Sequence, residues 1–149
     1  MKHLTLLLAF VPLLACPAAD RGGSGGGGGG DDDDAAGEGA RVTMETTLGT
    51  VLISVLEEES PIRADNFLQY IDDGFYDGSD GDGTTVFHRV IPGFMAQSGG
   101  LLETGARKTT RAPIQNESGV SGLLNTRGTL AMARTGDPHS ATSQSVIRD

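Results

Sequence analysis

The segment from Phe87 to Gly100 constrains the fold more than any other part of the chain. It consists of two short apolar runs on either side of Pro92-Gly93. A Pro-Gly pair between such runs is typical of a tight turn, so the segment predicts two antiparallel strands. This hairpin would bring together one cation, one amide and two bulky apolar side chains, namely Arg89, Gln97, Phe94 and Met95.

The sequence on both sides of this hairpin predicts more short strands and one helix. Alternating and β-branched residues predict a hairpin over 41–56 and further strands over 129–133 and 143–148. Ser60-Pro61 predicts the start of a helix, because serine can cap it and proline suits its first position. Apolar residues then recur at helical spacing at Ala64, Phe67, Leu68, Ile71 and Phe75. We therefore expect a mainly β, antiparallel, nearly closed domain with a helix at one end.

Composition narrows the classes of partner and cofactor. The chain has 149 residues, a formal net charge of −9 and one cysteine. No basic face is predicted, so nucleic acid is not an expected partner. One cysteine allows neither a disulfide within the chain nor a cysteine-based metal site. The acidic loop 76–84 resembles part of a calcium loop, but Ile91 stands where that pattern requires glutamate. No metal or cofactor is expected.

The first forty residues are typical of a targeting signal followed by a spacer. Residues 1–16 have a cationic start and a short apolar run, as an export signal does. The run ends in Leu13-Leu14-Ala15-Cys16, which resembles the lipobox of bacterial lipoproteins, so Cys16 is the predicted lipidation site. The alternative is an ordinary secretory signal with an incidental cysteine. Residues 17–39, rich in glycine and aspartate, predict a flexible linker. We expect a protein of the bacterial cell envelope or periplasm, tethered to the membrane through Cys16.

The remaining segment, 40–149, is expected to form a partial domain, in which Arg41 to Gln144 resembles the bacterial branch of the cyclophilins, the cyclosporin-type peptidyl-prolyl cis-trans isomerases. The resemblance is carried by the Phe87–Gly100 segment and by several shorter motifs in the same order. These motifs are Asn66-Phe67, Gly74–Gly78, Ile114–Glu117, Asn125–Arg134 and His139–Gln144. It implies an eight-stranded antiparallel barrel with a helix at each end, a monomer, and proline-containing polypeptides as partners.

The resemblance also implies roles for individual residues. Arg89 matches the catalytic arginine, and Phe94 and Met95 match the apolar floor beneath the substrate proline. The residues that match other substrate contacts are Gln97, Ala133, Arg134, Gln144 and Val146. Taken alone, outside this motif, Arg89 is better explained as a strand cation in a surface ion pair. Phe94 and Met95 have plain core packing as their alternative.

The sequence departs from the family pattern after Gln144. Two phenylalanines are expected next, but Ser145 and Val146 stand there. The second position forms a wall of the proline pocket, and the family continues for roughly fifty residues more, so the barrel is expected to be incomplete at the C-terminus. Two functions remain open: an isomerase that accelerates X-Pro isomerisation during folding of exported proteins, or a truncated, non-catalytic remnant or weak proline-peptide-binding module.

Overall fold

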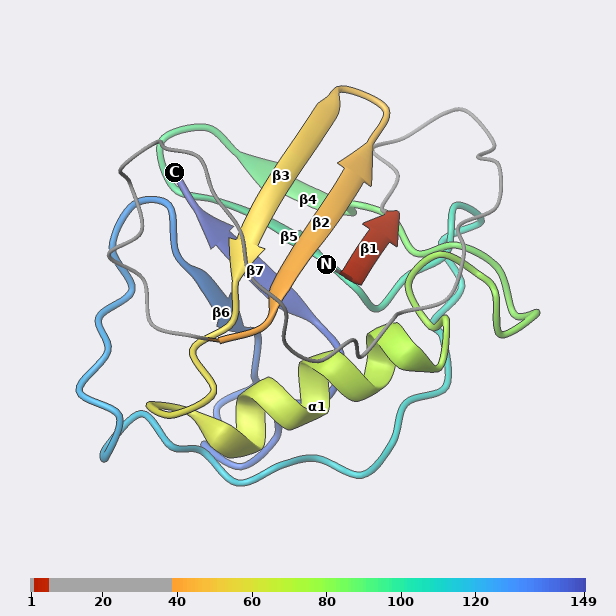
Figure 1. Cartoon of the computed structure of the whole chain (residues 1–149). Helices are drawn as coiled ribbons and strands as arrows, with labels where there is room; N and C mark the ends of the chain where they lie inside the picture. The colour runs from red at the N-terminus through yellow and green to blue at the C-terminus, as the bar shows by residue number, and fades with distance from the viewer. Residues whose placement is uncertain (1, 6–38) are drawn as a thin grey trace, which may run out of the picture.

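The protein, as a computed structural model, contains one helix and seven strands among the residues that the structure describes, which are 2–5 and 39–149. In chain order the elements are β1 (Lys2–Thr5), β2 (Arg41–Thr46), β3 (Gly49–Ser54), α1 (Pro61–Asp72), β4 (Arg89–Ile91), β5 (Met95–Ser98), β6 (Leu130–Met132) and β7 (Ser145–Arg148). The described strands form two sheets, ordered β1-β2-β3 and β4-β5-β7-β6. In Figure 1, β2 and β3 pass in front of the four-stranded sheet and α1 runs beneath.

The first sheet is built on the predicted hairpin. β2 and β3 pair antiparallel from Arg41 opposite Ser54 to Thr46 opposite Gly49. Strand β1 lies on the other side of β2 and runs parallel to it. This strand belongs to the segment predicted as an export signal, whereas Cys16 and the predicted linker up to residue 38 lie outside the described residues.

The second sheet is antiparallel throughout and brings together segments far apart in sequence. β5 pairs with β4 on one side and with β7 on the other, and β7 also pairs with β6. The hairpin predicted from Pro92-Gly93 is therefore confirmed, although its strands are shorter than the apolar runs suggested. The last predicted strand becomes β7, which lies in the middle of the sheet.

The hydrophobic core lies between α1 and the two sheets. The predicted helical stripe is buried, apart from half-buried Ile71. The residues at the centre of the core are Val42, Met44, Val55, Ala64, Phe67, Leu68, Tyr70, Phe75 and Tyr76, with Leu130 and Ile147 of the second sheet packed against them. Burying each large apolar side chain stabilises the fold by roughly 1.5–3 kcal/mol. The mainly β architecture with one covering helix is thus confirmed.

The helix α1 begins at Pro61 as predicted, but its capping interaction differs from the prediction. Ser60 makes no capping hydrogen bond with its side chain. Instead, the buried carboxylate of Glu117 accepts from the backbone N–H groups of Ile62 at 3.1 Å and Arg63 at 2.9 Å. The Ser60 hydroxyl accepts from the Arg63 guanidinium. A distant loop residue therefore satisfies the free N–H groups that every helix start exposes.

The described residues contain no helix with both the length and the apolar character needed to cross a bilayer.

Candidate active site

The register of the four-stranded sheet places several predicted site residues in one row. Arg89 of β4 lies opposite Gln97 of β5, Gln97 lies opposite Val146 of β7, and Val146 lies opposite Ala131 of β6. Residues directly opposite one another project from the same face of a sheet. Arg89, Gln97 and Val146 therefore share one face, although they come from positions 89 to 146 of the chain.

The predicted apolar floor lies beside this row. Met95 is two residues before Gln97 on β5, so it projects from the same face. Its side chain is buried, with 3% exposed, whereas Phe94, in the turn before β5, is 44% exposed. An apolar surface that stays accessible next to an arginine has the composition of a site for a neutral ring such as proline.

Gln144 joins the group through its side chain. The Gln97 amide Nε2 donates to Gln144 Oε1 at 2.9 Å, and the backbone N–H of Ala133 donates to the Gln144 carbonyl at 2.8 Å. A Cβ atom added to Gly100 would lie 2.5 Å from Gln144 Cγ and Nε2. Glycine at position 100 is therefore needed for the Gln144 amide to reach Gln97.

A buried tyrosine supports this arrangement from behind. The Tyr76 hydroxyl donates to the carbonyl oxygen of Ser143 at 2.8 Å, and the Ser143 hydroxyl donates to the Gly99 carbonyl at 2.6 Å. Burial raises the pKa of Tyr76 far above its ordinary value, with a smaller contribution from Tyr70. The phenol thus stays protonated and remains a donor, which fixes the backbone next to Gln144.

The structure brings together six of the predicted residues, places Phe94 beside them and leaves Arg134 apart. Those on the common face or bonded to it are Arg89, Met95, Gln97, Ala133, Gln144 and Val146. Phe94 adjoins them from the turn. Arg134 is exposed, and its guanidinium donates to the neighbouring Thr135 carbonyl at 3.3 Å. Cys16 lies outside the described residues. The roles of all these residues stay predictions.

One member of this face was missed by the sequence analysis. Arg148 of β7 lies opposite Met95, and its guanidinium carbon is 4.6 Å from the centre of the Phe94 ring. Asp149 follows, and its carboxylate accepts from the Gly93 N–H at 2.8 Å. The signal was available, because Arg148 is two residues after Val146 on a predicted strand and so must share its face.

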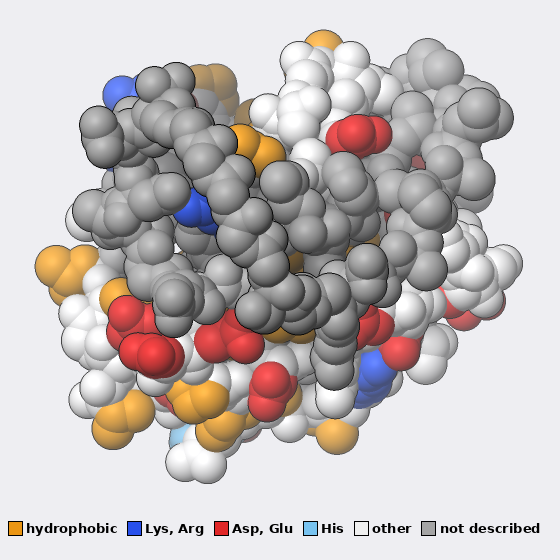
Figure 2. All heavy atoms as spheres, in the orientation of Figure 1, with side chains coloured by type: hydrophobic (Ala, Val, Ile, Leu, Met, Phe, Trp, Pro, Cys, Tyr) orange, Lys and Arg blue, Asp and Glu red, His pale blue; other side chains and the backbone are white. Residues whose placement is uncertain are grey.

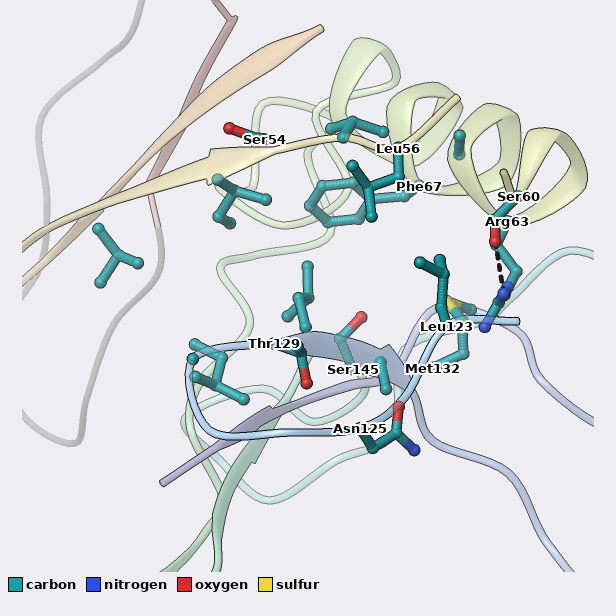
Figure 3. A pocket seen from close by; sticks show the side chains of 18 of the residues that line it. Ser54, Leu56, Ser60, Arg63, Phe67, Leu123, Asn125, Thr129, Met132 and Ser145 are labelled. Atoms are coloured by element: carbon teal, nitrogen blue, oxygen red, sulfur yellow. Dashed lines mark hydrogen bonds between the residues drawn. The ribbon is translucent and has the colours of Figure 1, made fainter. Parts of the chain in front are cut away.

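A separate cavity of about 440 Å³ lies between β3 and the β6–β7 side of the second sheet. Figure 3 shows Ser54, Leu56 and Phe67 on one wall, facing Leu123, Thr129 and Met132 on the other. Arg89, Phe94, Met95 and Gln97 do not line it. Its walls are mainly apolar and carry only one charged side chain, Arg63, which is paired with Glu117.

Comparison with known proteins identifies the family. The sequence model described as cyclophilin type peptidyl-prolyl cis-trans isomerase/CLD matches residues 41–148. The chain belongs to the cyclophilin family. This cyclophilin is 51% identical to a peptidyl-prolyl cis-trans isomerase of Acinetobacter baylyi over 106 residues, which cover 71% of the chain and 53% of that relative. It is 48% identical to peptidyl-prolyl cis-trans isomerase B of Escherichia coli over 106 residues, which cover 71% and 60%.

Solved structures agree with the observed fold. The cyclophilin AquaCyp293 from Hirschia baltica superposes with a TM-score of 0.59 at 22% identity, covering 72% of this chain and 56% of that one. A cyclophilin-type isomerase of Cryptosporidium parvum, crystallised in the presence of the dipeptide Ala-Pro, gives a TM-score of 0.56 at 27% identity, covering 68% and 63%. This cyclophilin therefore spans little more than half the length of the relatives that it matches.

The face has the groups for electrostatic catalysis, and it resembles no metal centre. Among the described residues, no group of three or more His, Cys, Asp or Glu side chains could hold a metal ion. Arg89 is exposed, and the described residues offer its guanidinium no carboxylate partner. A cation that is accessible and unpaired is free to interact with a bound polypeptide.

Proposed function

We propose that this cyclophilin accelerates the cis–trans isomerisation of X-Pro peptide bonds. The observation that carries the proposal is the row Arg89–Gln97–Val146 across β4, β5 and β7, with Met95 beside it. Two further facts support it. The matched relatives bear the name peptidyl-prolyl cis-trans isomerase, and the C. parvum cyclophilin was solved with a proline dipeptide.

The proposed chemistry needs only electrostatics and position. The barrier to rotation about an X-Pro bond arises because rotation breaks amide resonance, and it amounts to about 18–20 kcal/mol. In the twisted state the lone pair is localised on the prolyl nitrogen. The Arg89 guanidinium, which is always protonated, stabilises that state by donating a hydrogen bond and gains little from the planar amide.

The neighbouring groups would hold the substrate in place. Phe94 and Met95 would receive the proline ring, and the Gln97 amide, oriented by Gln144, would bind the peptide backbone. Val146 would form one wall of the proline site, with less apolar area than an aromatic residue offers there. The same face would thus supply binding and catalysis.

An isomerisation assay on the purified chain tests this proposal. With a chymotrypsin-coupled Ala-Ala-Pro-Phe substrate, we expect Arg89→Ala to lower kcat/KM by about 10²–10³-fold, as removal of one preorganised donor does in other enzymes. Arg41→Gln, on the other sheet, is the matched control and should keep the wild-type rate. If wild-type turnover does not exceed that of Arg89→Ala, the catalytic role is wrong.

We also propose that the protein acts on exported polypeptides while tethered to the membrane through Cys16. The support is the sequence alone: the cationic start, the short apolar run and the position of the only cysteine. Processing at Cys16 would remove β1, so β2 would lose its parallel neighbour. Mass spectrometry of the protein purified from an expressing bacterium should find a lipidated Cys16 as the first residue. An intact Met1 terminus, or a Cys16→Ser variant processed identically, would overturn the proposal.

A further inference from the structure

Arg148 is held against the predicted proline floor by several contacts at the end of β7. Its guanidinium lies over the Phe94 ring at 4.6 Å, within the range of a cation–π interaction. The backbone N–H of Asp149 donates to the Phe94 carbonyl at 3.2 Å, and the Asp149 carboxylate accepts from Gly93 at 2.8 Å. The turn and the strand end are therefore tied together, with Arg148 between them.

The charge of Arg148 is not neutralised within the described part of the chain. None of the ion pairs there includes Arg148, and its Nε is buried without a hydrogen-bond partner. The strand residues that share its face are neutral apart from a second arginine, Arg89. Two unpaired arginines on one face are unexpected in a chain of net charge −9.

The surface on the helix side shows the opposite charge. Acidic side chains gather there in Figure 2, over α1 and the turn before it. The exposed acids of this region are Glu57, Glu58, Glu59, Asp65, Asp72 and Asp73. These six acids lie on the helix side, whereas the site face of the four-stranded sheet carries Arg89 and Arg148.

The two arginines are separated by a distance that a short peptide can bridge. They lie two strands and one same-face step apart, which places their backbone positions about 12 Å from each other. An extended peptide rises about 3.3 Å per residue, so three or four residues span this distance. The Phe94 ring lies nearer, with its centre 4.6 Å from the Arg148 guanidinium carbon, so a proline on Phe94 would place the side chain next to it within reach of Arg148.

We propose that Arg148 is a specificity-determining residue that selects substrates with an acidic side chain next to the proline. This rests on the proposed function, because it assigns the substrate class of the same face. Guanidinium binds carboxylate through paired, charge-assisted hydrogen bonds. Arg148 is only partly buried and the Phe94 ring beside it is exposed, so a substrate carboxylate has room to approach the guanidinium.

The test compares peptides that differ only in the residue next to proline, with three residues at each of two positions. Glutamate, glutamine or lysine is placed directly before proline in one set and directly after it in another. In at least one set, we expect the wild-type kcat/KM for the glutamate peptide to exceed that for glutamine about tenfold, the ratio for one charged hydrogen bond. Arg148→Gln should bring this ratio to about one, and Arg41→Gln should leave it unchanged.

A second readout keeps this proposal separate from catalysis. Fluorescence anisotropy of the same labelled peptides gives Kd, and the glutamate-to-glutamine ratio of Kd should follow the same pattern in wild type and variants. If no peptide is turned over but the binding ratio depends on Arg148, the catalytic function fails and the selectivity stands. An unchanged ratio in Arg148→Gln, an equal change for all three residues, or no binding at all overturns the proposal.

Discussion

The two places where this cyclophilin could receive a peptide differ in kind. The cavity between β3 and β6 is hollow and apolar, and its only charged side chain, Arg63, is already paired. The site face of the four-stranded sheet carries unpaired Arg89, the Gln97–Gln144 amide pair and the accessible Phe94 ring. A twisted amide is stabilised best by a cationic donor at its nitrogen, and the sheet face offers one in unpaired Arg89, whereas the Arg63 of the cavity is held by Glu117. Hollow volume is therefore a poor guide to where isomerisation would occur.

This difference predicts that stability and activity can be changed separately. Glu117 caps α1 and pairs with Arg63 beside the cavity, with no contact to the site face. Glu117→Ala removes two hydrogen bonds to a charged group and leaves the two backbone N–H groups at the start of α1 without an acceptor. This should lower the free energy of unfolding by about 2–4 kcal/mol. Urea denaturation followed by circular dichroism measures this loss. Glu117→Gln, which keeps one acceptor oxygen, should lose less.

Below its melting temperature, the Glu117→Ala protein should retain kcat/KM within about twofold of wild type, because the loss concerns stability alone. A rate loss as large as that of Arg89→Ala would show that the cavity side and the site face are not independent.

Gly100→Ala, in contrast to Glu117→Ala, should lower activity more than stability. The added Cβ would displace the Gln144 side chain and break its hydrogen bond with Gln97, while the backbone at Gly100 needs no unusual conformation. We expect kcat/KM to fall about tenfold, equivalent to ~1.4 kcal/mol, with a smaller change in stability. Gly136→Ala is the control, since nothing lies within 4 Å of its added Cβ. Equal rates in the two variants would contradict a positioning role for Gln144.

Tyr76→Phe acts on both regions, because Tyr76 packs in the core and donates to Ser143 beside the site. Loss of the hydrogen bond should cost about 1 kcal/mol of stability near neutral pH. The pKa of Tyr76 is raised in the folded state, so its contribution is complete below the unfolded value of about 10 and is lost as pH rises above it.

Wild type should therefore lose stability between pH 10 and pH 11, whereas the Tyr76→Phe protein should lose less over the same interval. Denaturation with guanidinium chloride at pH 10 and at pH 11 measures the loss in free energy of unfolding for each protein. Identical losses in the two proteins would mean that Tyr76 is not the group responsible.

The local elements of this fold were predictable from sequence, and the contacts between segments far apart in the sequence were not. Pro92-Gly93 and the helical stripe after Pro61 identified the β4–β5 hairpin and α1, because turn chemistry and periodicity act over a few residues. The sequence did not reveal that Glu117 caps α1 from 54 and 55 residues away. Nor did it reveal that Lys108, buried, binds the Phe75 and Gly83 carbonyls and Asp80. Such contacts depend on the packing of distant segments.

The residues of the site were likewise predicted where they lie close together in the sequence. Arg89, Phe94, Met95 and Gln97 belong to one hairpin and were predicted together. Arg148 was missed because the resemblance assigned no role after Val146, although strand alternation was enough to place it on the same face. Family likeness thus identified the residues that match the family pattern, and the register added Arg148 to the same face.

We assign the binding of proline peptides to the sheet face and not to the cavity. The most direct test is proton–nitrogen NMR of the labelled protein during titration with an Ala-Ala-Pro-Phe peptide. Saturable shift changes should concentrate at Arg89, Gln97, Gln144 and Val146, while the cavity residues Leu52, Leu123 and Leu124 should stay unchanged. Shift changes that saturate at the cavity residues and spare the sheet face would contradict the assignment.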